Sequence, residues 1–463
     1  MQIVLAGYNI DKSLIERFIE NQETTPEVIS AAYARISRSS KSISELRQEA
    51  LSQINKARTS NENIIFEMGH SSVAEHAVFN IDIIGVSRLL TETLQRSRLA
   101  SFTEKSQRYV TFHNDFIVPS ELDHDLKVQY VALMGELFRE YQQTLGSLLI
   151  QVMADYPLLK KREQEGMAKE DARYILPLAT KTQMGMTINA RSLEALLRRL
   201  NGLNTSEALE LSQQLYRVVK DLTPSLIRYT EPDSFYQKCF EMTFPGSSQK
   251  PRSSVTLLSS PDEADLQILA ALLYSNAHTG YQEILDYLSQ ADAEEIARLS
   301  EQLYQDMQVW HKLPRAFEMA EFTFELHMSE SCWAQFKRHR LCTIIRQKHS
   351  FDDLQIVPPN IPADSRERWE ILLAKSCQLG QLIESKHPGI GAYALTNSHQ
   401  VTVLVRMNLR ELHHFVRLRS DEHAQWEIRV LSQEIARIIK TLCPITAKYL
   451  MGKSEFVPSQ QSN

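Results

Sequence analysis

One unit that occurs twice decides the fold: KTQMGMTINARSLEALLRRL at residues 181–200 and HQVTVLVRMNLRELHHFVRLR at residues 399–419. Each copy begins with a stretch typical of a β-strand. Each then passes through an Asn-x-Arg motif into a segment with apolar residues at helical spacing. Asn189 and Asn408 begin the two motifs and lie 219 positions apart, so the same strand-to-helix unit is repeated within one chain.

Other features recur in the same order. An Arg-x-Arg motif occurs at residues 96–98 and 338–340, so that Arg96 and Arg338 are 242 positions apart. Between the copies lies FPGSSQKPRSS, whose Pro, Gly and Ser content is typical of a linker. Repeats of this kind predict two homologous halves, residues 1–244 and 255–463, joined by a linker at residues 245–254.

The predicted fold class is α+β, with a small, mainly antiparallel sheet and long helices in each half. Strand-like runs open the halves at residues 2–6 and 255–260, and further β-like stretches at 77–86 and 320–329 precede the Arg-x-Arg motifs. Apolar residues at helical spacing predict one long helix from Leu409 to Ile439. The sequence has no GxGxxG, P-loop or nucleophile elbow, which argues against a βαβ nucleotide-binding fold.

Composition narrows the class of protein. The 463 residues carry a net charge of −6, which gives no sign of a nucleic-acid partner. No apolar run approaches the ~20 residues that a membrane-spanning helix needs. Five cysteines are scattered without a CxxC pair, so we expect reduced thiols, a cytoplasmic protein and no metal site.

The two Arg-x-Arg motifs allow two interpretations. Arginines at this spacing near a helix end usually form a solvated face or interact with the helix dipole. An anion site is the alternative, favoured because the planar guanidinium matches phosphate and because the pair recurs in both halves.

Two further groups of residues leave alternatives open. Glu104, Ser106 and Arg108 would share one face of an extended backbone, either as an ordinary surface strand or as a clamp for a phosphate or carboxylate. The histidines lack the spacing of metal ligands, so ordinary histidines are favoured and contact with a cofactor is the alternative. They are His70, His76, His413, His414 and His423.

Taken together, the motifs resemble those of the flavin-dependent thymidylate synthases, whose pattern is GHxxxxEH, RHRxxSxxExSxRY, NARS and LRxDxHAQWE. The first half has GHSSVAEH (69–76), RSRLASFTEKSQRY (96–109), ARYILP (172–177) and NARS (189–192). The second half has QFKRHR (335–340), NLR (408–410) and LRSDEHAQWE (418–427). The resemblance covers nearly the whole chain, one family unit in each half.

Each half departs from the family pattern where the other half keeps it. The first half has Ser97 for the motif His, Thr93 for the preceding Gln and Leu200 for the Arg of LRxD. The second half lacks the E-x-S-x-R set and has Ala392 for the Arg of ARxxLP and Met319 for the second His of GHxxxxEH. A division this clean favours specialisation of two duplicated halves over random decay.

The resemblance implies conversion of dUMP to dTMP with FAD as cofactor and with methylenetetrahydrofolate and NADPH as co-substrates. It implies that Arg419 is catalytic and favours ionisation of the uracil N3, because a nearby cation stabilises an anion. It implies a substrate-binding set of Gln335, Arg338, Glu104, Ser106, Arg108 and Arg173. It implies a cofactor-binding set of Ser37, His70, Ser72, His339, Arg340, Glu104, Asn189, Arg191, Asn408, Arg410, His414 and His423.

The same resemblance implies composite active sites shared between the two halves, and a homodimer that mimics the family's homotetramer. Two alternatives remain open. One is a sibling flavoenzyme that acts on another pyrimidine nucleotide, since Ser97 and His414 depart from the family pattern. The other is a non-catalytic homologue that binds FAD or a nucleotide.

Overall fold

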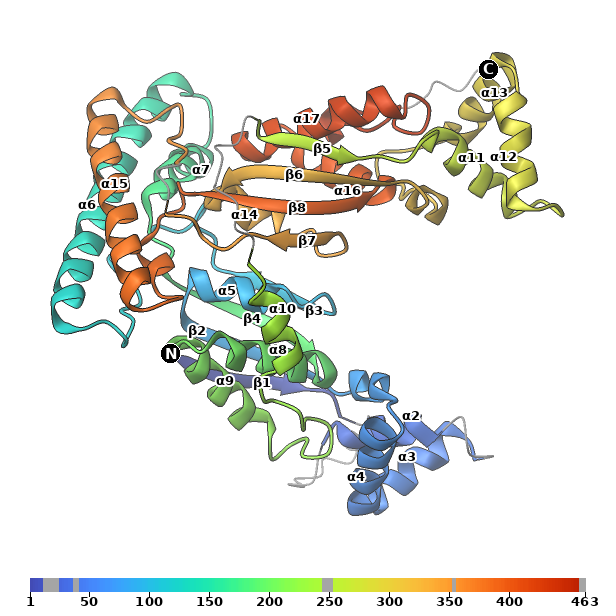
Figure 1. The fold of residues 1–463 in the computed structure, drawn as a ribbon, viewed down its shortest axis with the longest axis horizontal. Coiled ribbons are helices and arrows are strands. Elements are labelled where there is room, and N and C mark those ends of the chain that lie inside the picture. Colours follow the sequence, from blue (N-terminus) through green and yellow to red (C-terminus); the bar gives the residue numbers. More distant parts are fainter. Residues whose placement is uncertain (11–24, 36–40, 244–252, 352–354, 458–463) are drawn as a thin grey trace. The chain divides into compact units, whose positions relative to one another are not determined.

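A computed structural model describes residues 1–10, 25–35, 41–243, 253–351 and 355–457. It divides into two compact units, each best followed separately in Figure 1. The first unit comprises Met1–Ser247 and Val357–Asn397, and the second comprises Ser248–Ile356 and Ser398–Asn463. Most of the predicted linker, residues 245–252, lies outside the described residues.

The first unit contains a four-stranded antiparallel sheet in the order β1-β2-β4-β3. Its strands are β1 (Gln2–Tyr8), β2 (Val78–Ser87), β3 (Ala100–Glu104) and β4 (Lys181–Asn189). The central pair runs from Val78 opposite Asn189 to Ser87 opposite Lys181. Phe79, Ile81 and Ile83 point into the core while the intervening residues are exposed, as the two-residue period of a strand requires.

Two helices that follow β4 supply much of the core of this unit. They are α8 (Ala190–Leu203) and α9 (Ser206–Val219), and α8 buries Leu193, Leu196, Leu197 and Leu200 against the sheet residues. Helix α5 (Arg88–Gln95) follows β2 directly. The other α-helices that the first half of the sequence contributes are α2 (Glu27–Arg35), α3 (Ile43–Ser52), α4 (Ile54–Glu62), α6 (His124–Asp155), α7 (Lys161–Ala172) and α10 (Ser234–Phe240).

The second unit repeats the sheet topology in the order β5-β6-β8-β7. Its strands are β5 (Val255–Ser259), β6 (Glu321–Ser329), β7 (Thr343–Arg346) and β8 (Gln400–Asn408). Its helices are α11 (Ala264–Tyr274), α12 (Tyr281–Gln290), α13 (Ala293–Tyr304), α14 (Glu330–Phe336), α16 (Leu409–Arg419) and α17 (Trp426–Leu442). The α+β fold class and the duplication are therefore confirmed. Among the described helices, none is long and apolar enough to cross a membrane.

The predicted single helix from Leu409 to Ile439 is wrong. Helix α16 ends at Arg419, and α17 begins at Trp426. Gln425 caps the new helix, because its side-chain oxygen accepts a hydrogen bond from the Ile428 backbone N–H at 3.2 Å. The break leaves residues 420–425, SDEHAQ, as a connection between two helices instead of a helical surface.

One segment of the second sequence half belongs to the first unit. It contains α15 (Ala363–Lys386), which packs along α6, as Figure 1 shows. Trp369 of α15 is fully buried, and its Nε1 donates to Thr144 Oγ1 of α6 at 2.9 Å. Pro177 and Thr396, which are 219 positions apart like the two Asn-x-Arg motifs, form a β-bridge with each other. Corresponding segments of the two halves therefore pair within this unit.

Candidate functional site

In the first unit, Glu104 lies where β3 ends. Its side chain is 5% exposed, Gln95 Nε2 donates to its Oε2 at 2.8 Å, and Arg88 Nη1 lies 3.8 Å from its Oε1. Residues 107–109 form a turn, so the predicted extended backbone through Arg108 is wrong beyond the strand. Ser106 Oγ instead accepts a hydrogen bond from the Arg108 backbone N–H at 3.2 Å, which is the local bonding typical of turns.

Arg173 is a buried guanidinium that follows α7. Its Nε donates to the Glu170 backbone oxygen at 3.2 Å, whereas its buried Nη2 has no hydrogen-bond partner among the described residues. Burial lowers the Arg173 pKa to about 10; Glu170 opposes this shift, and the charges of Arg108 and Arg88 add to it. Arg108 Nη2 also lies 2.6 Å from Glu170 Oε2. The guanidiniums of Arg88, Arg108 and Arg173 outnumber the nearby carboxylates of Glu104 and Glu170. The group therefore carries a net positive charge, which would favour binding of an anion.

Asn397 connects these groups and was missed by the sequence reasoning. Its fully buried amide accepts a hydrogen bond from Arg88 Nε at 3.0 Å and donates to Gln107 Oε1 at 3.1 Å and to the Arg173 backbone oxygen at 2.8 Å. Asn397 comes from the second half of the sequence, so a second-half residue completes the surroundings of the first-half loop. Asn397 reaches this position because the preceding residue, Thr396, forms a β-bridge with Pro177. The sequence alone does not reveal that pairing.

In the second unit, Arg419 and His339 are joined directly. Arg419 Nε donates to His339 Nε2 at 3.1 Å, and Arg419 Nη2 donates to the Gln335 backbone oxygen at 3.1 Å. Because Nε2 accepts, the ring proton sits on Nδ1, which lies 3.6 Å from Glu411 Oε1. Burial lowers the His339 pKa; Glu411 opposes this shift, and Arg419 adds to it. The ring is therefore neutral at physiological pH, and three predicted site residues meet here.

The two Asn-x-Arg motifs have the same structural role in both units. Asn189 caps α8 and Asn408 caps α16, accepting hydrogen bonds from backbone N–H groups at 2.8 and 2.9 Å. Arg191 Nη1 lies 2.5 Å from Glu75 Oε1, and the matching contact of Arg410 Nη1 with Glu318 Oε1 is 2.7 Å. Helix capping and ion pairing account for the repetition of this motif, and its predicted cofactor contacts stay predictions.

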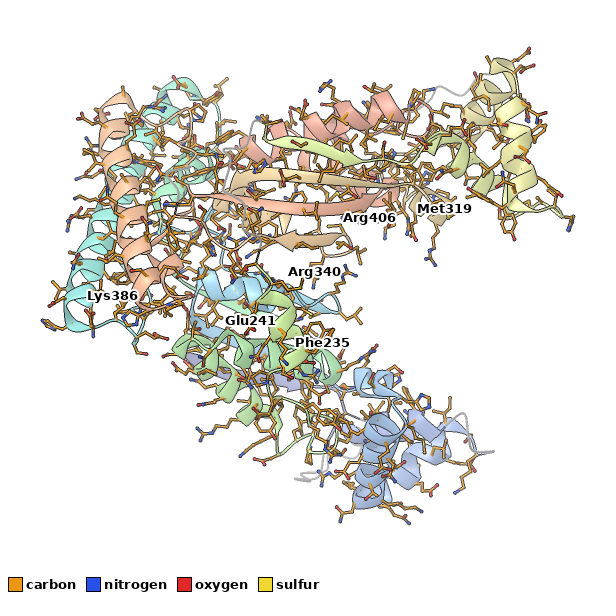
Figure 2. The ribbon with its side chains drawn as sticks, in the orientation of Figure 1. Phe235, Glu241, Met319, Arg340, Lys386 and Arg406 are labelled. Carbon is orange, nitrogen blue, oxygen red and sulfur yellow. The ribbon has the colours of Figure 1, made fainter. Side chains whose placement is uncertain are left out.

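The other predicted residues lie on connections beside helices or strands. His70 and Ser72 are exposed ahead of β2, and Arg338 is exposed after α14. Arg340, labelled in Figure 2, is partly buried, and burial lowers its pKa. The His414 ring centroid lies 5.8 Å from that of His339, and the His423 side chain is 88% exposed. Ser37 lies outside the described residues.

The second unit carries a charge-exchanged version of the Arg88–Glu104 pair. Glu330 and Arg346 stand 242 positions after Arg88 and Glu104, as do the second Arg-x-Arg residues after the first. Glu330 and Arg346 form an ion pair, with side chains 2% and 5% exposed. His349 Nε2 lies 3.1 Å from Glu330 Oε1. The acidic and basic residues have therefore changed places between the halves. The end of β7, where Arg346 lies, is held to α14 by this ion pair.

Arg199 is a second residue that the sequence reasoning missed. Leu200 stands 219 positions before Arg419, at the corresponding place in its helix, and is fully buried. The preceding Arg199 nevertheless donates from Nη2 to Ser97 Oγ at 2.6 Å. Ser97 and His339 are the middle residues of the two Arg-x-Arg motifs. In each unit this middle residue accepts a hydrogen bond from an arginine of the helix that follows the Asn-x-Arg motif, Arg199 in the first unit and Arg419 in the second.

The described residues contain no group of His, Cys, Asp or Glu side chains that could hold a metal ion. His413 is a core residue: its ring nitrogen Nε2 lies 3.1 Å from the Thr446 backbone oxygen, and burial lowers its pKa to about 4. The five cysteines are free thiols, and four of them are buried.

The comparison with protein families decides the classification. The family model described as "Thymidylate synthase complementing protein" matches residues 19–225 and again residues 256–445. The chain belongs to this family. Its two matches fall on the two halves, so the thymidylate synthase unit is present twice.

Relatives of two kinds match this thymidylate synthase family chain. A flavin-dependent thymidylate synthase of Clostridium tetani is 30% identical over 47% of this chain and 86% of its own length. A UPF0159 protein of Thermoplasma acidophilum is 24% identical over 83% of this chain and 86% of its own length. A solved flavin-dependent thymidylate synthase of Helicobacter pylori, complexed with FAD and dUMP, is 18% identical and covers 49% of this chain and 100% of its own, with a TM-score of 0.33.

Proposed function

We propose that the protein is a flavin-dependent thymidylate synthase that converts dUMP to dTMP. The observation that carries the proposal is the buried Arg173 guanidinium, whose Nη2 has no hydrogen-bond partner among the described residues. A buried unpaired donor on a charged group is costly, and the phosphate of a nucleotide would satisfy it. Membership of the family and the relatives that bear this name supply the substrate.

In this proposal Arg108 and Arg173 bind the phosphate, and Ser106 adds a hydroxyl donor. Arg338 and Gln335 bind the nucleotide from the second half, so each half supplies groups that the other lacks. Arg419 stabilises negative charge on the uracil ring, which raises the electron density at C5. Its hydrogen bonds to His339 and to the Gln335 carbonyl hold the guanidinium in one orientation. The chain thereby needs no enzyme thiolate for this step.

FAD is the proposed cofactor, with NADPH and methylenetetrahydrofolate as co-substrates. The donor set suits a flavin with a diphosphate: Arg340 offers a guanidinium, His70 and His339 offer rings, and Ser72 offers a hydroxyl. When bound, the flavin supplies the hydride chemistry, while the protein binds and orients. Ser37, Glu104, Asn189, Arg191, Asn408, Arg410, His414 and His423 complete the proposed cofactor set. The proposal also includes a homodimer in the cytoplasm.

The test is tritium release from dUMP labelled at C5, with FAD, the folate and NADPH present. We expect release by the wild-type protein, and a loss of about 10- to 150-fold in kcat/KM for Arg173→Gln, the equivalent of one charge-assisted hydrogen bond. Arg139→Gln, which removes an exposed charge from α6 of the same unit, serves as the matched control. A protein that binds FAD but releases no tritium would contradict the proposed reaction.

A further inference from the structure

We propose that helices α11, α12 and α13 of the second unit form a docking surface for a basic, amphipathic segment of a partner protein. The surface combines an apolar groove between α11 and α12 with a concentration of carboxylates. None of its residues belongs to the proposed dUMP or FAD sets, so the inference goes beyond the proposed function.

The groove lies where α11 ends and α12 begins, and it encloses about 460 Å³. Its apolar lining comes from Leu273, Ala277, Ile284 and Tyr287. Glu283, in the first turn of α12, adds a carboxylate to the wall. An apolar lining with an acidic group at its side favours a ligand that carries both an apolar side chain and a positive charge.

The core that these three helices share leaves apolar side chains partly exposed. Figure 1 shows α12 and α13 (yellow) at one end of the second unit, with α11 leading to them from β5. Leu288 and Leu299 are buried between the helices, whereas Leu273 and Leu285 beside them are only partly buried. Tyr287 is 56% exposed. An apolar side chain docked in the groove would remove more of this surface from water, which stabilises the complex.

The same helices concentrate negative charge. Residues 262–306 contain ten Asp and Glu residues against one Arg and no Lys, a formal charge of −9, whereas the whole chain carries −6. The one arginine, Arg298, is already paired with Glu295 at 2.8 Å. Glu283 and Asp286 are exposed on α12, beside the groove. Lys or Arg side chains of a partner would therefore meet complementary charge here.

Charge also decides between a partner protein and a second copy of this chain. Two copies joined through this surface about a two-fold axis would bring the same carboxylates face to face, which costs free energy. A basic segment instead gains attraction to the surface, and its cation can stack on the exposed ring of Tyr287. An amphipathic helix presents an apolar anchor and basic side chains together, which is how helices bind in grooves.

The experiment measures binding of a fluorescent helical peptide of Leu and Lys to the full-length protein by anisotropy. We expect saturable binding that Glu283→Lys weakens about ten-fold or more, because the substitution reverses a charge on the groove wall. Glu455→Lys is the matched control, since it makes the same change in net charge at an exposed residue of the second unit outside the three helices. It should alter the affinity by less than about two-fold, because salt screens distant charges. No peptide binding, or equal losses in the two variants, would overturn the proposal.

A second variant and a second peptide test the apolar groove. Tyr287→Ser shortens an exposed side chain, so we expect an unchanged fold and peptide binding that is weaker by about ten-fold. A peptide of Ser and Lys with the same charge should bind much more weakly than the Leu and Lys peptide. Equal binding of the two peptides would mean that charge alone attracts them, and would overturn the groove.

Sedimentation of the peptide-free protein tests the other occupant. A concentration-dependent dimer that both Glu283→Lys and Tyr287→Ser abolish would assign the surface to a second copy and overturn the partner proposal. Unchanged sedimentation in the two variants supports it. Peptide binding is read without dUMP or FAD, so its failure is distinguishable from a failure of tritium release.

Discussion

At the residue scale, Asn397 shows how one buried amide can organise charged neighbours. It uses its acceptor for Arg88 and its donor group for the Gln107 side chain and the Arg173 carbonyl. Asn397→Leu copies the residue at the corresponding position of the first half, Leu178, and removes all three bonds. We expect a rise of about ten-fold or more in KM for dUMP, because Arg173, the arginine proposed to bind the phosphate, loses its support.

The measurement for Asn397 is steady-state kinetics with dUMP as the varied substrate. Asn55→Leu, on the exposed surface of α4, is the control for loss of an amide elsewhere in the unit. If Asn397→Leu and Asn55→Leu have the same KM and the same thermal midpoint, the amide does not position the site.

Sequence reasoning finds candidate site residues that belong to contiguous motifs and misses those that only the fold brings near. Arg173, Arg419 and His339 stand in motifs, and the structure joins the last two directly. Asn397 has no motif of its own, because its role depends on a bridge between Pro177 and Thr396. Arg199 was missed because the helical register points to Leu200, whereas a long arginine side chain reaches across the register.

At the element scale, the strands that open the two halves and the central strands were predicted, whereas the edge strands β3 and β7 were not. The predicted stretches match β2, β4, β6 and β8, which are the central strands of the two sheets. Each of these strands buries one face, so apolar residues recur at every second position. β3 and β7 lie at sheet edges with five and four residues and were not predicted, although β5, an edge strand as short as β3, was. The break between α16 and α17 was missed although the connecting residues 420–425, SDEHAQ, contain one apolar residue, Ala424, and so interrupt the helical spacing.

The charge-exchanged pairs give a prediction for the loops that follow β3 and β7. Glu330→Arg would set two guanidiniums against each other beside α14, and we expect a loss of about 3–5 kcal/mol in the free energy of unfolding. The double variant Glu330→Arg/Arg346→Glu restores opposite charges in the order that the first half uses, and it should recover most of this loss. Urea unfolding followed by tryptophan fluorescence measures both, because Trp333 stacks against Arg346.

A double-mutant cycle isolates the pair from other effects. The matched control is Arg298→Glu on α13, where an exposed ion pair with Glu295 contributes little. If the double variant is no more stable than Glu330→Arg alone, the two side chains do not act as a pair.

At the scale of the whole molecule, the duplication is more than two units in series. Segment Val357–Asn397 of the second half is part of the first unit, where α15 packs on α6 and Tyr393 donates to the buried Glu207 carboxylate at 2.5 Å. Sequence repeats predict the two halves but cannot predict which half a helix packs against, because both copies have similar apolar faces. The surroundings of Arg173 therefore depend on residues from both halves.

The last prediction tests this dependence through Trp369, the buried indole of α15. Trp369→Ala removes the largest apolar side chain between α15 and α6 together with its hydrogen bond to Thr144, and we expect a loss of about 3–5 kcal/mol. Because Asn397 is the last residue of the same segment, dUMP binding should weaken as well. Trp310→Ala, at a tryptophan that is 70% exposed, is the matched control and should change stability by less than about 0.5 kcal/mol. Differential scanning calorimetry with and without dUMP measures both effects. Equal unfolding temperatures for the two variants would mean that α15 is dispensable to the first unit, and that the second half does not support the Arg173 site.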